Sequence, residues 1–187
     1  MRSNVLHRLM FLIVAATVLN PSTTLAQSIA VPDTWTATPF LGAGFGTNGP
    51  GNSLGMGAAV SYDFTQNLGV EGEVGHLFDV AGDTHAIDWS VTTISGNAVY
   101  HFDVVRFTPY ATFGLGVERS SVDVKDPDPL ALTIPSSTEV VWNFGGGAKY
   151  KVTNQMIARV DLRRFQAADL APDFWRLYGG LTFWLRR

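Results

Sequence analysis

Residues 156–165 read MIARVDLRRF, a stretch in which apolar and charged side chains alternate from Ala158 to Arg163. Successive side chains of a β-strand point to opposite faces, so this pattern predicts a strand with one apolar face and one charged face. The apolar positions are Met156, Ala158, Val160 and Leu162, and the charged positions are Arg159, Asp161 and Arg163.

Two further stretches, 68–80 and 138–152, keep all of their charged side chains on a single parity. These are Glu71, Glu73 and Asp79 in the first stretch and Glu139, Lys149 and Lys151 in the second. Across the whole chain, turn residues separate eight segments with period-two patterning, and their glycine, β-branched and aromatic content disfavours helix. The predicted strands of this all-β chain are Pro39–Thr47, Leu54–Phe64, Leu68–Val80, Trp89–Phe102, Phe107–Arg119, Thr138–Val152, Met156–Phe165 and Phe174–Arg186.

Such alternation fits either a soluble sandwich or lipocalin with its apolar face inside, or an outer-membrane barrel with its apolar face in lipid. The segments favour the barrel because they match the roughly 9–11 tilted residues that span a bilayer. Aromatic residues at both ends of the apolar parity predict two interfacial belts. Connections also alternate in length, as periplasmic turns and extracellular loops do. They are short at 65–67, 103–106 and 153–155, and long at 48–53, 81–88, 120–137 and 166–173.

The composition excludes several other classes of protein. The chain of 187 residues has no cysteine, which excludes a disulfide scaffold, thiolate metal sites and cysteine nucleophiles. Its 16% charged and 46% hydrophobic residues do not fit a disordered chain. A formal net charge of −3 without a basic cluster argues against nucleic-acid binding.

The N-terminal segment has the features of a secretory signal peptide. Arg2 and Arg8 precede an apolar stretch from Leu9 to Leu19, and small residues lead to a cleavage site after Ala26. An N-terminal membrane anchor is the alternative, but the apolar stretch is short for a bilayer. We therefore expect three regions: a signal peptide at 1–26, a polar lead at 27–38 and the barrel at 39–187.

The last predicted strand carries the most specific motif. Residues 178–185 read YGGLTFWL and resemble the C-terminal signal that the barrel assembly machinery reads, through Tyr178, Gly180, Phe183 and Leu185. The chain from Phe40 to Leu185 is similar to the small eight-stranded outer-membrane β-barrels, the class of the outer-membrane protein A barrel domain and the opacity-type surface proteins. This resemblance implies a monomeric antiparallel up-and-down transmembrane barrel in a Gram-negative outer membrane. Its implied partners are outer-membrane lipid, lipopolysaccharide and the assembly machinery.

The interior of an eight-stranded barrel is only wide enough for side chains, so the polar parity should fill it. Because isolated buried charges are costly, opposite charges are expected to pair. Glycines on the same parity, such as Gly75 and Gly147, should relieve crowding. A narrow path for protons or ions is the alternative interpretation of this parity. We predict a structural ionic network in two layers of mixed sign: Glu71, Glu73, Lys149, Arg159 and Asp161 towards the periplasm, and Glu118, Glu139, Arg163 and Arg176 towards the outside.

Residues suited to catalysis are sparse. An outer-leaflet enzyme resembling the lipid A deacylases would need a serine nucleophile, a histidine base and an acidic partner. His76 lies on the lipid-facing parity without a serine two residues away, His85 lies in an acidic loop, and His101 should hydrogen-bond a neighbour inside the barrel. The glycine clusters at 42–46 and 145–147 lack the strand-to-helix setting of a nucleotide loop. We expect no catalytic residue, no cofactor and no metal.

Recognition would reside in the outer loops, of which residues 120–137 form the longest. The apolar run from Leu130 to Ile134 favours contact with the barrel rim or lipid, and adhesion to a surface ligand is the alternative. The sequence thus predicts a non-enzymatic outer-membrane barrel with an envelope-structural or surface-interaction role. A lipid-modifying enzyme and a narrow ion channel are the alternative functions.

Overall fold

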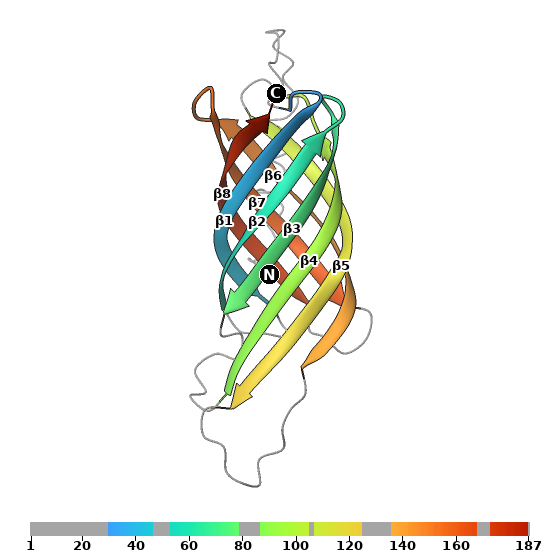
Figure 1. The fold of residues 1–187 in the computed structure, drawn as a ribbon, viewed down its shortest axis with the longest axis vertical. Helices are drawn as coiled ribbons and strands as arrows, with labels where there is room; N and C mark the ends of the chain where they lie inside the picture. The colour runs from blue at the N-terminus through green and yellow to red at the C-terminus, as the bar shows by residue number, and fades with distance from the viewer. Residues whose placement is uncertain are drawn as a thin grey trace, which may run out of the picture.

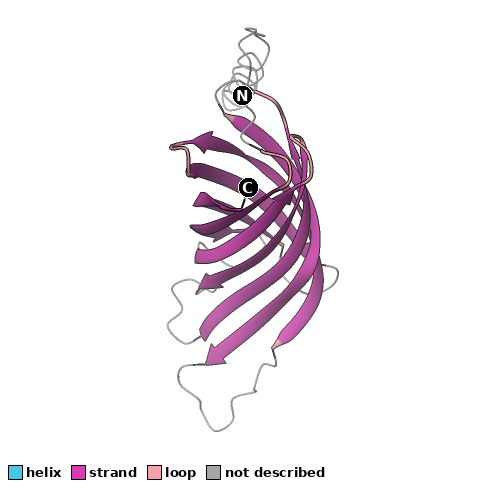
Figure 2. Ribbon diagram, turned by 45° about the horizontal axis from the view of Figure 1, so that its top comes forward, coloured by secondary structure: helices cyan, strands magenta, loops and turns pink. Residues whose placement is uncertain are grey.

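The computed structural model describes residues 30–46, 53–78, 87–104, 107–124, 136–167 and 173–186. The predicted signal peptide, His85 and residues 125–135 of the predicted long loop lie outside these ranges. Within them, no helix is long and apolar enough to cross a membrane. Figure 2 shows that the described elements are strands.

Each strand pairs antiparallel with its neighbours in sequence, and β1 pairs with β8 to close the sheet. Figure 1 shows the resulting barrel, whose strands run obliquely to its long axis. The predicted all-β, eight-stranded up-and-down barrel is therefore confirmed. The strands are β1 (Thr34–Phe45), β2 (Ser53–Asp63), β3 (Leu68–Phe78), β4 (Ile87–His101), β5 (Thr108–Val124), β6 (Ser137–Lys151), β7 (Met156–Ala167) and β8 (Phe174–Arg186).

Two predicted strand boundaries differ from the structure by more than two residues. β1 begins at Thr34, so part of the predicted lead at 27–38 belongs to the barrel. The sheet tolerates Pro39 inside β1 because the ladder to β8 resumes only at Phe40, leaving the residue that lacks an N–H out of that pairing. β5 continues to Val124, so the start of the predicted 120–137 loop is strand.

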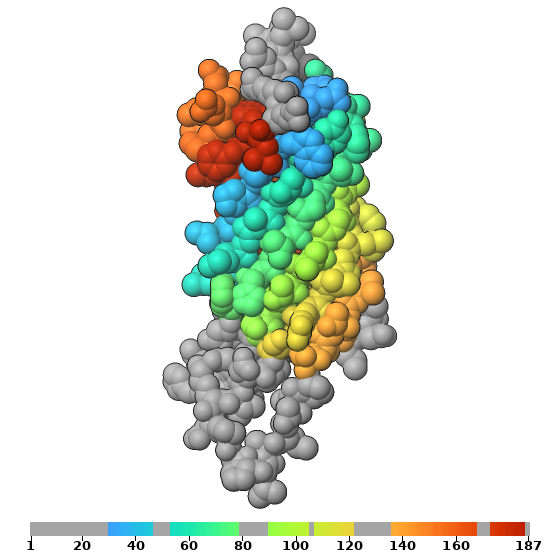
Figure 3. All heavy atoms as spheres, in the orientation of Figure 1, coloured from blue at the N-terminus to red at the C-terminus, as the bar shows by residue number. Residues whose placement is uncertain are grey.

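The two faces of the barrel wall differ in polarity as the alternation predicts. Val140 and Val160 point outward and are 61% and 56% exposed, whereas Glu71 and Arg159 point inward and are 3% and 2% exposed. A soluble barrel would have the opposite arrangement, so the outward face is the one that contacts lipid. In the space-filling view, the strands form a continuous wall on the face shown (Figure 3).

Aromatic side chains form contacts at both ends of the outward face. Near the short turns, the rings of Trp35 and Tyr62 lie 5.0 Å apart. Near the opposite end, Trp142 stacks on Phe144 at 5.5 Å, and Phe144 contacts Trp175 at 6.5 Å. Amphipathic aromatic rings favour the two membrane–water interfaces, so these contacts mark the two edges of the apolar band.

Candidate functional site: the barrel interior and outer rim

The middle of the interior is filled by an ionic layer of three carboxylates and three guanidinium groups, all buried. The equal numbers make this layer formally neutral. Strands β3, β7 and β8 supply it, because their inward parity is the charged one. Its members are Glu71, Glu73, Arg159, Asp161, Arg163 and Arg176.

Glu71 is held by two arginines of β7. Nη1 of Arg159 donates to one oxygen of Glu71, and Nη2 lies 3.2 Å from the other. Nη2 of Arg163 donates to Glu71 at 2.7 Å, and Nε of Arg163 donates to Asp161 at 2.9 Å. Forked pairing of this kind suits the planar guanidinium group and satisfies carboxylate oxygens that water does not reach.

The positions of Arg163 and Arg176 correct the predicted two-layer arrangement. Both were expected in an outer layer with Glu118 and Glu139, but Arg176 donates to Glu73, and Nη1 of Arg163 lies 3.2 Å from a Glu73 oxygen. Barrel strands are tilted and staggered, so residues equally far from their turns do not lie at equal depth. Six of the nine predicted interior residues therefore meet in one layer.

Two tyrosines complete the ionic layer and were missed as interior residues. The Tyr110 hydroxyl donates to Asp161 and accepts a 2.7 Å hydrogen bond from Nε of Arg159. The Tyr178 hydroxyl accepts from Nη2 of Arg163 at 3.2 Å. Their parity was the available signal, because Tyr110 shares it with Glu118 and Tyr178 shares it with Arg176.

The four residues of the predicted assembly signal divide between the two faces. Tyr178 is buried inside the barrel, and Gly180 shares its inward parity. Phe183 and Leu185 are exposed on the outward face. Recognition by the assembly machinery stays a prediction for these residues.

An apolar layer fills the interior on the outer side of the ionic layer, where charged residues were predicted. Its side chains are almost fully buried and form one cluster, in which the rings of Phe165 and Phe174 stack at 5.0 Å. Each member faces inward, but alternation gives the face of a residue and not its level, so the sequence did not show that apolar side chains fill this part of the interior. The members are Leu77, Val91, Val141, Phe165 and Phe174.

Three predicted interior residues lie outside the ionic layer. Glu118 is 1% exposed, and neither of its carboxylate oxygens has a hydrogen-bond partner among the described residues. Glu139 lies directly opposite it on β6. Lys149 lies towards the periplasmic end, where its Nζ is 2.9 Å from Nε2 of His101. Since an ammonium group only donates, Nε2 of His101 accepts, which confirms that this histidine hydrogen-bonds a neighbour.

The chain matches the model of the outer-membrane protein β-barrel domain over residues 12–183. The chain belongs to this family. It is an outer-membrane β-barrel of the Gram-negative type, as the localisation prediction stated.

Several solved structures share the fold of this outer-membrane barrel. Neisserial surface protein A has a TM-score of 0.62 and 17% identity, over 80% of this chain and 96% of that chain. The N-terminal barrel of Pseudomonas aeruginosa OprF has a TM-score of 0.59 and 18% identity, over 82% and 98%. Ail of Yersinia pestis has a TM-score of 0.56 and 14% identity, over 82% and 100%. A comparison with curated proteins found no match.

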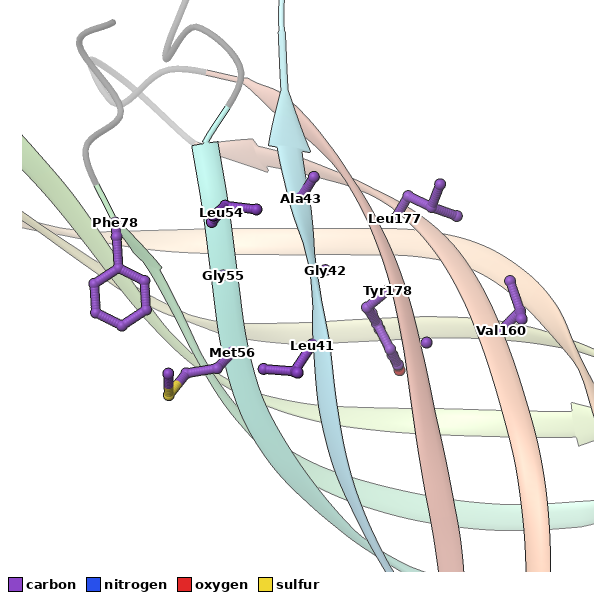
Figure 4. A pocket seen from close by; sticks show the side chains of 11 residues that line it. Leu41, Gly42, Ala43, Leu54, Gly55, Met56, Phe78, Val160, Leu177 and Tyr178 are labelled. Atoms are coloured by element: carbon purple, nitrogen blue, oxygen red, sulfur yellow. The ribbon is translucent and has the colours of Figure 1, made fainter.

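An apolar hollow of about 740 Å³ lies on the outward face of the outer-membrane barrel, over β1, β2 and β8. In Figure 4, Leu41, Leu54, Met56 and Leu177 surround it. Its lining has no carboxylate, histidine or serine, so it offers a surface for acyl chains and no groups for acid–base chemistry.

His76 lies beside this hollow on the outward face, opposite Met56 in the sheet register. Its Nδ1 is 2.8 Å from Oγ1 of Thr92 on β4, and its ring meets Phe78 edge-on. Glu71 and Glu73 of the same strand point into the interior. The arrangement thus pairs a histidine with a hydroxyl, and the contacts of His76 with the described residues include no carboxylate that would orient it.

Proposed function

We propose that this outer-membrane barrel is non-enzymatic and has an envelope-structural or surface-interaction role, exercised through its extracellular loops and its lipid-facing wall. The observation that carries this proposal is the packing of the interior. The ionic layer and the apolar layer are stacked along the barrel axis, and their side chains are almost completely buried from water. An aqueous pore would leave its lining side chains exposed.

The electrostatics of the interior support a structural role. The carboxylates of the ionic layer are each matched by a guanidinium group, so the layer presents no net charge to attract a permeating ion. The apolar layer adds a desolvation barrier beside it. The neutral ionic layer and the apolar layer together favour a filled barrel rather than a narrow channel.

The outward face supports a non-enzymatic role over the lipid-modifying alternative. Acyl hydrolysis of the deacylase type needs a nucleophile, a base and a group that orients the base. The described contacts of His76 supply a threonine hydroxyl and an aromatic ring, and no third catalytic group.

A surface role is also consistent with one of the similar proteins. Ail is an attachment invasion locus protein, and one of its structures is a complex with the heparin analogue sucrose octasulfate. The proposed partners of this chain are outer-membrane lipid, lipopolysaccharide and, during biogenesis, the barrel assembly machinery acting on Tyr178–Leu185. A surface ligand would be bound by the loops.

Two measurements on the folded protein test the proposal. In planar bilayers, the heat-modifiable form should give no stable single-channel steps; reproducible steps would overturn the filled barrel. In cells, lipid A analysed by mass spectrometry should be the same with the wild type, with His76→Phe and with an empty vector. A lipid A species made by the wild type and lost with His76→Phe would establish the enzyme instead.

A further inference from the structure

Four outward-facing polar residues lie side by side across four consecutive strands. The sheet register pairs His76 of β3 with Thr92 of β4, Thr92 with Arg119 of β5, and Arg119 with Thr138 of β6. We call these four residues the rim row. Neighbouring strands lie about 4.8 Å apart, so one small anionic group can contact Arg119 and a flanking hydroxyl together.

The rim row lies immediately above an apolar row. Two residues closer to the periplasm on each strand, the register aligns four apolar side chains, all of them exposed. This change from apolar to polar occurs on all four strands at the same position in the sheet register. The apolar row consists of Val74, Ile94, Val117 and Val140.

The height of Arg119, which carries the charge of the rim row, matches the outer membrane–water interface. Arg119 follows Phe107, which is exposed near the periplasmic turns, by 12 residues. At about 3.3 Å per residue and a strand tilt of about 40°, Arg119 lies about 30 Å above Phe107, just beyond the apolar band of about 25 Å. This is the level of lipid headgroups.

Arg119 differs from the other described outward arginine. Arg164 donates to Asp173 at 2.9 Å and lies over the ring of Trp175. Arg119 is exposed and forms no hydrogen bond or ion pair with any residue whose side chain the structure describes. A cation at the edge of a low-dielectric medium is stabilised by a nearby anion, and a guanidinium group binds phosphate oxygens especially well.

We propose that the rim row binds a phosphate group of an outer-leaflet lipid, the phosphorylated headgroup of lipid A. Arg119 supplies the charge, Thr92 and Thr138 supply flanking hydroxyls, and His76 orients the Thr92 hydroxyl through their 2.8 Å contact. The acyl chains of the same lipid lie on the apolar row directly below. This inference rests on the lipid-facing role proposed above, and it adds a defined site and a defined headgroup chemistry.

The test measures lipid A binding to the refolded full barrel by native mass spectrometry, with bisphosphorylated lipid A and with its dephosphorylated form as probes. Arg119→Gln should weaken binding of the phosphorylated probe by about tenfold, the loss expected for one charge-assisted hydrogen bond. Thr138→Val should weaken it by a smaller factor, and binding of the dephosphorylated probe should not change with either variant.

Arg164→Gln is the matched control, because it removes the same charge from an outward arginine that is already paired with Asp173. It should bind phosphorylated lipid A as the wild type does. An equal loss in both arginine variants would overturn the site in favour of diffuse charge attraction. Wild-type binding by Arg119→Gln, or equal binding of both probes by the wild type, would also overturn it.

The failure of this site and the failure of the proposed function give different results. Channel steps or altered lipid A in the wild type would overturn the proposed function, whatever Arg119→Gln does to lipid binding. An inert wild type whose affinity for phosphorylated lipid A is unchanged by Arg119→Gln would overturn the site alone. Heat-modifiable migration of each variant shows that it is folded.

Discussion

Arginine occurs on both faces of the barrel wall, but its contacts within the protein differ between the two faces. In the interior, Arg163 contacts Glu71, Glu73, Asp161 and Tyr178. On the outward face, Arg119 has no partner among the described side chains. A guanidinium group sealed from water needs its partners within the protein, whereas one at the lipid–water interface finds water and lipid headgroups. We therefore expect the interior arginines to contribute to the stability of the fold and Arg119 to contribute to lipid binding.

The largest effect should come from removing an interior arginine. Arg163→Ala, and likewise Arg159→Ala, should cost about 3–5 kcal/mol of unfolding free energy, because each leaves buried carboxylates without a partner. Heat-shift electrophoresis and urea unfolding of the folded barrel measure the loss. Arg164→Ala, which removes a partly exposed pair with Asp173, should cost less than about 1 kcal/mol. Wild-type stability in both interior variants would show that the ionic layer does not stabilise the fold.

The apolar layer gives the next effect. Phe165→Ala should cost about 3 kcal/mol, since it leaves a cavity beside Phe174 that its neighbours cannot fully close. Leu162→Ala on the outward face of the same strand should cost less, because lipid chains fill the space. Equal losses in urea unfolding would show that the two faces are packed alike.

A smaller contrast is expected between two glycines. A Cβ at Gly147 would lie 2.6 Å from the Tyr110 hydroxyl, so Gly147→Ala should cost about 1–3 kcal/mol through overpacking. A Cβ at the outward Gly72 would meet nothing within 4 Å, so Gly72→Ala should leave the unfolding midpoint unchanged. Destabilisation by Gly72→Ala comparable to that by Gly147→Ala would contradict this assignment of the two faces.

The smallest effect on stability should come from the rim. In vesicles without lipid A, Arg119→Gln should change the unfolding free energy by less than about 0.5 kcal/mol, as a surface substitution does when it breaks no internal contact. Urea titration in phosphatidylcholine vesicles measures it. A loss of the size expected for Arg163→Ala would mean that Arg119 has a structural partner within the protein.

The alternation of MIARVDLRRF and its counterparts predicted the strands, the polarity of each face and the burial of Glu71 and Arg159. This succeeded because side-chain direction in a strand depends only on local parity. The depth of each interior residue along the barrel axis was not predicted correctly from the sequence. Arg163 and Arg176 were placed too far outward, and the apolar layer around Phe165 was missed, because alternation gives the face of a residue and not its level.

By itself, the sequence determined an eight-stranded barrel with charged residues inside and apolar residues in lipid, since apolar and polar side chains alternate with a period of two in each segment. Only the tertiary structure decided which charges meet. Glu71 and Arg159 are 88 residues apart in the chain, and barrel closure with staggered strands brings them into contact. The same register brought His76, Thr92, Arg119 and Thr138 side by side across four strands, because strand pairing decides which residues become neighbours, and no single segment encodes that pairing.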